Sequence, residues 1–235
     1  MAKPSTTTKA TTKVTSKVTT KSATPGSASS RREQRRLQVQ DLSRTQLLDA
    51  AEDVFGSKGF HDATLKEVAE LAEFSVGSVY SFFENKDDLF LQVFLRRGDE
   101  FMAGLDRAVH AEGTPTEVLA GLVAFEISFF REHHRFGRLY FRYSSPLALS
   151  PDRLVDQGLT QNFERSMEMQ ADLFARGQQA GEFRDGDPKV LARLFSGVMA
   201  AYQSIDPAVM SDDPLVEESF PLPDLQALVL AAFKR

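Results

Sequence analysis

The chain has 235 residues, of which 42% are hydrophobic and 26% charged, and these proportions are typical of a globular protein. It contains no cysteine, which excludes disulfide bonds, thiol catalysis and zinc–thiolate sites. The net charge of −5 is unevenly distributed: residues 1–36 carry nine basic and one acidic side chain, whereas the other 199 residues carry 19 basic and 32 acidic ones. A segment of net charge +8 therefore precedes a body of net charge −13.

Residues 1–30 consist almost entirely of Thr, Ser, Ala and Lys. Such a segment buries too little apolar area to offset the entropy of ordering it, so we predict a disordered basic tail over residues 1–36. It lacks the apolar core of a secretory signal, and no apolar run approaches the ~20 residues of a membrane span. A cytoplasmic, nucleoid-associated protein without a membrane partner is expected. The spaced cations of the tail are suited to binding a polyanion. The alternative is a solubilising tail without a specific role.

The first helical pattern follows the tail and predicts a small domain over residues 37–86. Its apolar positions recur at helical spacing along one face: Leu47, Leu48, Ala50, Ala51, Val54 and Phe55. Gly59 is placed to end this helix. Thr64 and Glu67 form a capping box that opens a second helix, and Ser75 can cap a third. Second and third helices joined by about three residues predict a helix-turn-helix.

The segment AEFSVGSVYSFFENKDDLF, residues 72–90, adds a specific motif. It resembles the recognition-helix segment of TetR/AcrR-type transcriptional regulators, in which a Gly-Ser/Thr-Leu/Val-Tyr core runs into an aromatic pair and then Asn/Ser-Lys-Asp/Glu. The resemblance covers roughly residues 42–102. It implies an all-α fold in which an N-terminal three-helix helix-turn-helix module is followed by an α-helical ligand-binding and dimerisation bundle.

Two positions of the motif depart from the family pattern. Glu73 stands where the family usually turns on Gly, so we expect either a positive φ at this residue or a different turn. Val76 stands where a polar or basic side chain is common. It cannot hydrogen-bond a base, but it can contact a thymine methyl group.

A helix-turn-helix lays its second helix in the major groove, with N-terminal residues near the base edges. Because Val79 and Phe83 face the core, the positions predicted to face DNA are Ser75, Val76, Gly77, Ser78, Tyr80 and Ser81. Contacts with the DNA backbone are predicted at Arg44, Thr64 and Lys86, and Lys66 is predicted to reach either the groove or the backbone. The resemblance also implies the phosphate contact of Lys86. A purely structural role is the alternative for four of these residues. Ser75 and Thr64 would then be only helix caps, Tyr80 a packing ring and Lys86 a solvated cation.

The predicted DNA-binding module holds few cations, although non-specific affinity for DNA comes mostly from phosphate neutralisation. Four arginines stand directly before it: Arg31, Arg32, Arg35 and Arg36. We hypothesise that this end of the tail lies along the DNA backbone or in a flanking minor groove.

The remaining residues, 87–235, predict a bundle of helices without strand alternation. In chain order the expected helices cover residues 86–111, 115–133, 152–180, 188–205 and 223–234, with a short aromatic helix or turn at 135–144 and a loop at 206–223. Asp187 before Pro188 is a favoured helix start. The resemblance implies that this part of the chain is the ligand-binding and dimerisation domain.

The bundle is rich in Phe, Tyr and Met, which suits an apolar pocket for a small effector molecule. The resemblance implies such a pocket, and its candidate lining residues are Phe101, Leu105, Phe125, Phe129, Tyr140, Phe141, Tyr143, Phe163 and Met167. Plain core packing is the alternative for each of them. The resemblance also implies a homodimer through helices 188–205 and 223–234, with packing inside one chain as the alternative.

No G-x-S-x-G, P-loop, G-x-G-x-x-G or H-E-x-x-H motif is present, so no enzyme, cofactor or metal site is predicted. The predicted function is a dimeric regulator, most simply a repressor, that binds a palindromic double-stranded DNA operator and is released by a small apolar effector. Two other functions stay open: an architectural DNA-binding protein that uses its basic tail, and an enzyme built on the helical pocket.

Overall fold

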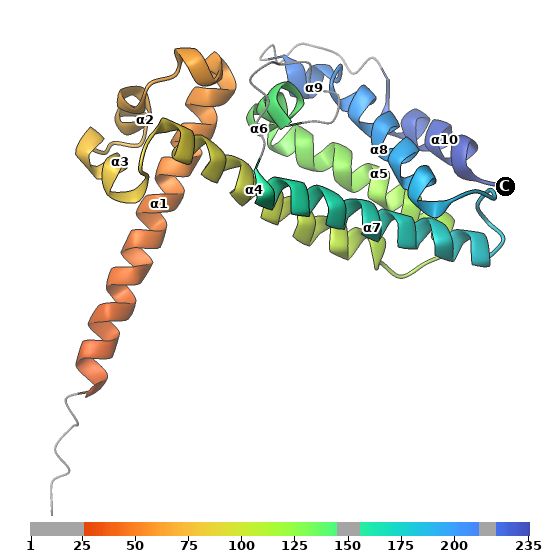
Figure 1. Cartoon of the computed structure of the whole chain (residues 1–235), viewed down its shortest axis with the longest axis horizontal. Helices are drawn as coiled ribbons and strands as arrows, with labels where there is room; N and C mark the ends of the chain where they lie inside the picture. Colours follow the sequence, from red (N-terminus) through yellow and green to blue (C-terminus); the bar gives the residue numbers. More distant parts are fainter. Residues whose placement is uncertain (1–25, 145–155, 212–219) are drawn as a thin grey trace, which may run out of the picture. The chain divides into compact units, whose positions relative to one another are not determined.

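The computed structural model describes residues 26–144, 156–211 and 220–235, and within these ranges it is helical (Figure 1). Its helices are α1 Gly26–Asp62, α2 Leu65–Leu71, α3 Val76–Phe82, α4 Lys86–Val109, α5 Pro115–Glu132, α6 His134–Leu139, the π-helix η1 Tyr140–Ser144, α7 Gln157–Gln179, α8 Pro188–Gln203, α9 Pro207–Met210 and α10 Leu222–Phe233. The described ranges contain no strand, only an isolated bridge between Phe183 and Lys234. The all-α prediction is confirmed.

Helix α1 begins at Gly26 and not near Leu37, so the prediction of a disordered tail is wrong for residues 26–36. The rest of the predicted tail, residues 1–25, lies outside the described residues.

This early start rests on local propensity and not on burial, because residues 30–42 are all exposed. The segment is rich in Arg, Gln and Leu, which are good helix formers, and has no Gly or Pro until Gly56. Glu33 and Arg36 add an ion pair of 2.7 Å one turn apart. A prediction based on apolar periodicity cannot detect such a helix.

The chain divides after Asp41 into two units, and Leu42–Arg235 forms the larger one. In this unit α1 breaks at Gly59, which has φ 80° and ψ 172°, a conformation that glycine adopts without steric strain. Helices α2 and α3 then follow with the predicted caps. In the turn between them Glu73 has φ 60°, so of the two alternatives expected at this position the structure shows the positive φ.

The helix-turn-helix packs around a small core in which Leu47, Phe55, Val68, Val79 and Phe83 are almost fully buried. Side chains from α1, α2 and α3 meet there with the first turns of α4. Each helix contributes one apolar face, as the periodicity of the sequence predicted.

The bundle contains α4, α5, α7 and α8 running alongside one another, with α10 against α5 and α8 (Figure 1). The first part of α4, including Phe90 and Phe94, belongs to a first core, which contains side chains of α1, α2 and α3 together with side chains of α5, α6 and η1. Its last part, including Met102 and Leu105, belongs to a second core shared with α5, α7, α8 and α10. Helix α4 therefore connects both cores physically.

Two predicted boundaries differ in the structure. Helix α7 begins at Gln157 with Asp156 as its N-cap, while residues 152–155 of the predicted helix lie outside the described residues. The predicted loop 206–223 contains the short helix α9, which Asp206 caps through the backbone N–H of Ala208.

Candidate DNA-binding surface and ligand cavity

Helix α3 presents an exposed face made of Val76, Gly77 and Tyr80. Tyr80 is 57% exposed and Val76 37%, although both are large side chains that could have been buried. A Cβ atom built on Gly77 would have only one neighbour within 4 Å, the Oγ of Ser75 at 3.7 Å. The fold therefore leaves this face open and does not need a glycine at position 77 for packing.

The three serines of α3 hydrogen-bond locally. Ser75 is the N-cap, and its Oγ accepts from the backbone N–H of Ser78 at 3.0 Å and lies 2.8 Å from the Ser78 Oγ. Ser81 donates its hydroxyl to the carbonyl of Ser78 at 2.6 Å. Each hydroxyl oxygen keeps acceptor capacity, but all three have a structural role in the helix.

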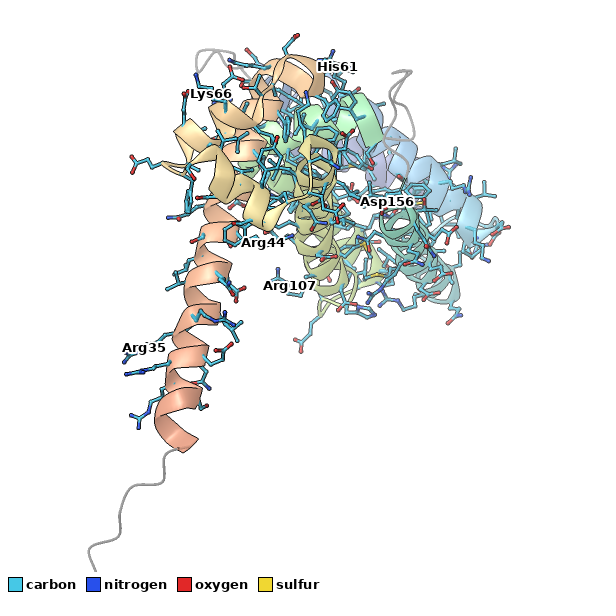
Figure 2. All side chains as sticks on the ribbon, turned by 60° about the vertical axis from the view of Figure 1, so that its left-hand side comes forward. Arg35, Arg44, His61, Lys66, Arg107 and Asp156 are labelled. Carbon is cyan, nitrogen blue, oxygen red and sulfur yellow. The ribbon has the colours of Figure 1, made fainter. Side chains whose placement is uncertain are left out.

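The N-terminus of α2, where a phosphate was predicted, is occupied by a carboxylate of the chain itself. Glu67 accepts from the backbone N–H and from the hydroxyl of Thr64, both at 2.9 Å, and from Lys58 Nζ at 2.5 Å. The hydrogen bonds from Lys58 and then Thr64 lower the pKa of Glu67 from 4.5 to about 2. Thr64 therefore acts as the cap of a capping box. Lys66 on the same helix is exposed, with Glu70 at 3.5 Å, and projects outward (Figure 2).

Lys86 does not lie free for a phosphate. Its Nζ donates to the carbonyls of Phe60 at 2.8 Å, Ala63 at 3.0 Å and His61 at 3.3 Å, which accounts for all three ammonium hydrogens. The ammonium also lies over the Phe60 ring, 4.4 Å from its centroid. The predicted phosphate clamp is wrong in this conformation, because Lys86 fastens α4 to the end of α1.

Arg44 has a similar internal role. Its guanidinium donates to the side-chain oxygen of Gln92 on α4 at 2.5 Å and lies over the ring of Phe83. The side chain is partly buried, and Figure 2 shows it at the middle of α1. In the structure Arg44 connects α1 with α3 and α4, so its predicted DNA contact is not supported by its position.

A cavity of about 250 Å³ lies inside the bundle, bounded by α4, α5, α6, η1, α7 and α8. Four of the nine residues predicted to line a pocket do so: Phe101, Tyr140, Phe163 and Met167. The prediction of a pocket wall is wrong for the other five, which do not line this cavity: Leu105, Phe125, Phe129, Phe141 and Tyr143.

These five side chains fill other space. Leu105 is completely buried in the second core, Phe129 and Phe141 lie in the first, and Phe125 covers Gly104. Tyr143 packs edge-on against Phe90, and its hydroxyl accepts from the backbone N–H of Phe60 at 3.3 Å. Helical spacing alone does not distinguish a face that lines a cavity from one that fills a core.

The cavity also has polar lining residues that the sequence reasoning missed. Glu126, Gln170 and Gln203 come from α5, α7 and α8 and are 5%, 3% and 3% exposed. Burial alone raises the pKa of Glu126 from 4.5 to about 8, so this carboxyl is largely protonated at pH 7. One signal was visible in the sequence: Glu126 interrupts the apolar run from Leu122 to Phe130.

Comparison with known proteins agrees with this arrangement. The profile of the family described as "Bacterial regulatory proteins, tetR family" matches residues 47–93, which run from α1 into the first turns of α4. The chain is a TetR-family transcriptional regulator.

Relatives of this TetR-family chain include the fatty acid metabolism regulator protein of Bacillus subtilis, 24% identical over 149 residues, which are 63% of the chain and 74% of that protein. The HTH-type transcriptional activator FasR of Mycolicibacterium smegmatis is 32% identical over 101 residues, or 43% of the chain and 46% of that protein.

Solved structures show the same fold. FadR of Bacillus subtilis in complex with stearoyl-CoA has a TM-score of 0.61 and 22% identity, covering 80% of the chain and 95% of FadR. The ketosteroid regulator KstR2 of Mycobacterium tuberculosis has a TM-score of 0.62 and 22% identity, covering 82% and 95%.

In this TetR-family regulator, ion pairs join the cavity wall to the DNA-binding module. Arg97 of α4 lines the cavity, and its Nε donates to the carboxylate of Glu52 on α1 at 2.7 Å. Arg96 donates to the same carboxylate at 2.9 Å. Glu52 is buried, and both arginines are its ion-pair partners. A second bond from Arg97 reaches Glu100 at 2.5 Å.

The described part of this TetR-family chain lacks two further features. None of its helices has the length and apolar character needed to cross a membrane. Its described residues contain no group of three or more His, Asp or Glu side chains that could hold a metal ion.

Proposed function

We propose that the chain binds a palindromic operator as a homodimer through α3, and that a small apolar effector in the bundle cavity releases it. The observation that carries the DNA-binding part is the open face of α3, where Val76, Gly77 and Tyr80 point away from the core. Exposed apolar and aromatic side chains on one short helix need a partner surface, and a major groove fits a helix-turn-helix.

Each position of this face has a distinct proposed role. Val76 contacts a thymine methyl group, Gly77 allows close approach of the DNA, and the Tyr80 hydroxyl donates to a phosphate. Ser78 and Lys66 add polar and phosphate contacts at the edge. The hydroxyls of Ser75 and Ser81 accept from donors on DNA while keeping their local bonds.

The proposed dimer uses the outer faces of α8 and α10. On α8 the exposed side chains of Val190 and Leu194 lie one turn apart and form an apolar stripe. Ile205, just after the end of α8, and Leu228 of α10 are also exposed. Gly197 lies within the α8 stripe with no neighbour within 4 Å, which allows another helix to approach closely. A second copy of the chain covers this face and brings two α3 helices about 34 Å apart, one turn of B-DNA.

The proposed release follows from the position of α4, which carries side chains of both cores. An effector that prefers one arrangement of the bundle shifts the population toward it by its differential affinity. The ion pairs of Glu52 with Arg96 and Arg97 transmit this change in the bundle to α1. If α4 moved without α1, these ion pairs would break and leave the buried carboxylate of Glu52 uncompensated. The known complex of FadR with stearoyl-CoA supports an effector with an apolar chain.

Selection of bound duplexes from a random DNA library tests this proposal. We expect two inverted half-sites with centres about 10 base pairs apart, or a multiple of one helical turn. Even coating of DNA without a shared motif, with steep salt dependence, would instead favour the architectural alternative. No observation favours an enzyme. The proposal includes a cytoplasmic location.

The exposed arginines at the start of α1 are proposed to contact DNA phosphates as well, now from a helix and not from a flexible arm. Arg35 projects from this part of α1 (Figure 2). Deleting residues 1–36 should flatten the slope of log K against log salt in operator binding. An unchanged slope would contradict this role.

A further inference from the structure

The lining of the bundle cavity is apolar over most of its area, but it also contains buried polar side chains, three of which we call the polar wall. The polar wall consists of Glu126, Gln170 and Gln203, three buried side chains from three different helices. The apolar lining includes Phe94, Phe101, Met102, Phe130, Phe163 and Met167.

Some of the polar atoms of this wall lack a partner within the described part of the protein. Gln170 Oε1 and Gln203 Nε2 are buried and have no hydrogen-bond partner in the described part of the chain. No described side chain pairs with the carboxyl of Glu126, whose pKa responds to burial alone. An unpartnered buried polar group costs about 1–3 kcal/mol, so the wall lowers the stability of the bundle unless a ligand supplies partners.

We propose that this wall binds an uncharged hydrogen-bonding group, a hydroxyl or a carbonyl, at the buried end of an otherwise apolar effector. The proposal rests on the proposed effector role of the cavity and adds the chemical class of the effector. The two amides and the carboxyl together offer donors and acceptors, whichever way each amide is oriented.

The charges around the wall disfavour an anionic group at this end. Among the described lining residues Arg97 is the only cation, and it is already paired with Glu52 and Glu100. Asp156, at the start of α7 (Figure 2), adds a carboxylate to the lining. Glu126 is protonated at neutral pH and therefore donates without adding charge. A fatty carboxylate would lose its hydration here without gaining a free cation.

The test compares four probes of equal chain length on the full-length protein: dodecanol, a dodecanone, dodecanoate and dodecane. We expect the alcohol and the ketone to bind at least tenfold more tightly than the carboxylate and the alkane, as measured by calorimetry at neutral pH. Equal or tighter binding of dodecanoate or dodecane would overturn the proposal, as would failure of all four to bind.

Variants separate a ligand-binding wall from a structural one. Gln170→Leu and Gln203→Leu should raise the Tm of the ligand-free protein and abolish the preference for the alcohol. Gln179→Leu, the same exchange at an exposed position of α7, should change neither. A lowered Tm with the preference intact would mean that the glutamines are structural, and would refute the proposal.

The same probes distinguish this proposal from the proposed function. If the alcohol binds with the expected preference but leaves operator affinity unchanged, the effector role is refuted while the chemistry of the wall is supported. If dodecane releases the operator as well as dodecanol does, the effector role stands and the polar wall is refuted.

Discussion

Replacing Glu126 by Gln removes a titrating group from the bundle while keeping the shape of the side chain. In the folded protein burial raises the pKa of Glu126 to about 8, whereas the ordinary value is 4.5. Between these two pH values the folded state keeps a proton that the unfolded state releases. The wild type should therefore lose stability as the pH rises from 4.5 to 8, and Glu126→Gln should not lose this contribution.

The size of the effect follows from the width of this pH window. One bound proton changes the free energy of unfolding by about 1.4 kcal/mol per pH unit, so the difference between the two proteins approaches about 4–5 kcal/mol across the window. Above pH 8 both states are ionised at this position, and the difference should become constant. That amount is a large fraction of the stability of an ordinary domain.

Urea denaturation followed by circular dichroism, at several pH values from 5 to 8, measures the effect. Other titrating groups that change between the folded and unfolded states, such as His133 and Glu67, are present in both proteins and cancel in the comparison. Plots of unfolding free energy against pH should diverge, with the variant gaining over the wild type as pH rises. Parallel plots would refute the assignment of a buried, unpartnered carboxyl.

Four further substitutions test the remaining assignments. Gly77→Ala should stabilise the fold by up to about 1 kcal/mol and weaken operator binding at least tenfold, because the added methyl group lies on the open face of α3. Glu73→Asn should raise the free energy of unfolding by up to about 1 kcal/mol, since Asn tolerates the positive φ better. Lys86→Met should destabilise the protein by about 2 kcal/mol by leaving three carbonyls without their charged donor. Leu194→Glu should dissociate the dimer in analytical ultracentrifugation, because that side chain is 56% exposed on the α8 stripe.

Matched variants control for non-specific effects. Gly121→Ala, another open glycine in a helix, should stabilise the fold without affecting operator binding. Lys66→Met should weaken operator binding and leave stability unchanged, the opposite of Lys86→Met. Leu71→Glu, an exposed leucine of α2, should leave the dimer intact. Reversed outcomes for the two lysines would restore Lys86 as the phosphate contact.

Local features of the helix-turn-helix could be predicted because their partners lie within one helical turn. The caps at Thr64 and Ser75 join residues three positions apart, and such pairs are visible in the sequence. The positive φ at Glu73 was one of two alternatives expected because the family pattern has a glycine at this position. The long helix through residues 26–36 was missed because propensity, and not apolar spacing, maintains it.

The role of Lys86 could not be predicted, because its partners are the carbonyls of residues 60, 61 and 63 at the broken end of α1. The same reason applies to the bond from Lys58 to Glu67, whereas the capping box that places Glu67 at the N-terminus of α2 was visible in the sequence. Whether a cation is free for DNA depends on neighbours that only the fold brings together.

The uneven charge, the helical periodicity and the motif at residues 72–90 determined the all-α class and the regulatory family without any coordinates. The cavity is different, because of the nine side chains predicted to line it, all taken from helical patterns, four do so and five fill the core around it. Only the packing of α4, α5, α7 and α8 decided that Phe163 lines the cavity while Phe129 fills the core. The same packing placed Glu126 in an apolar environment, and so determined its charge.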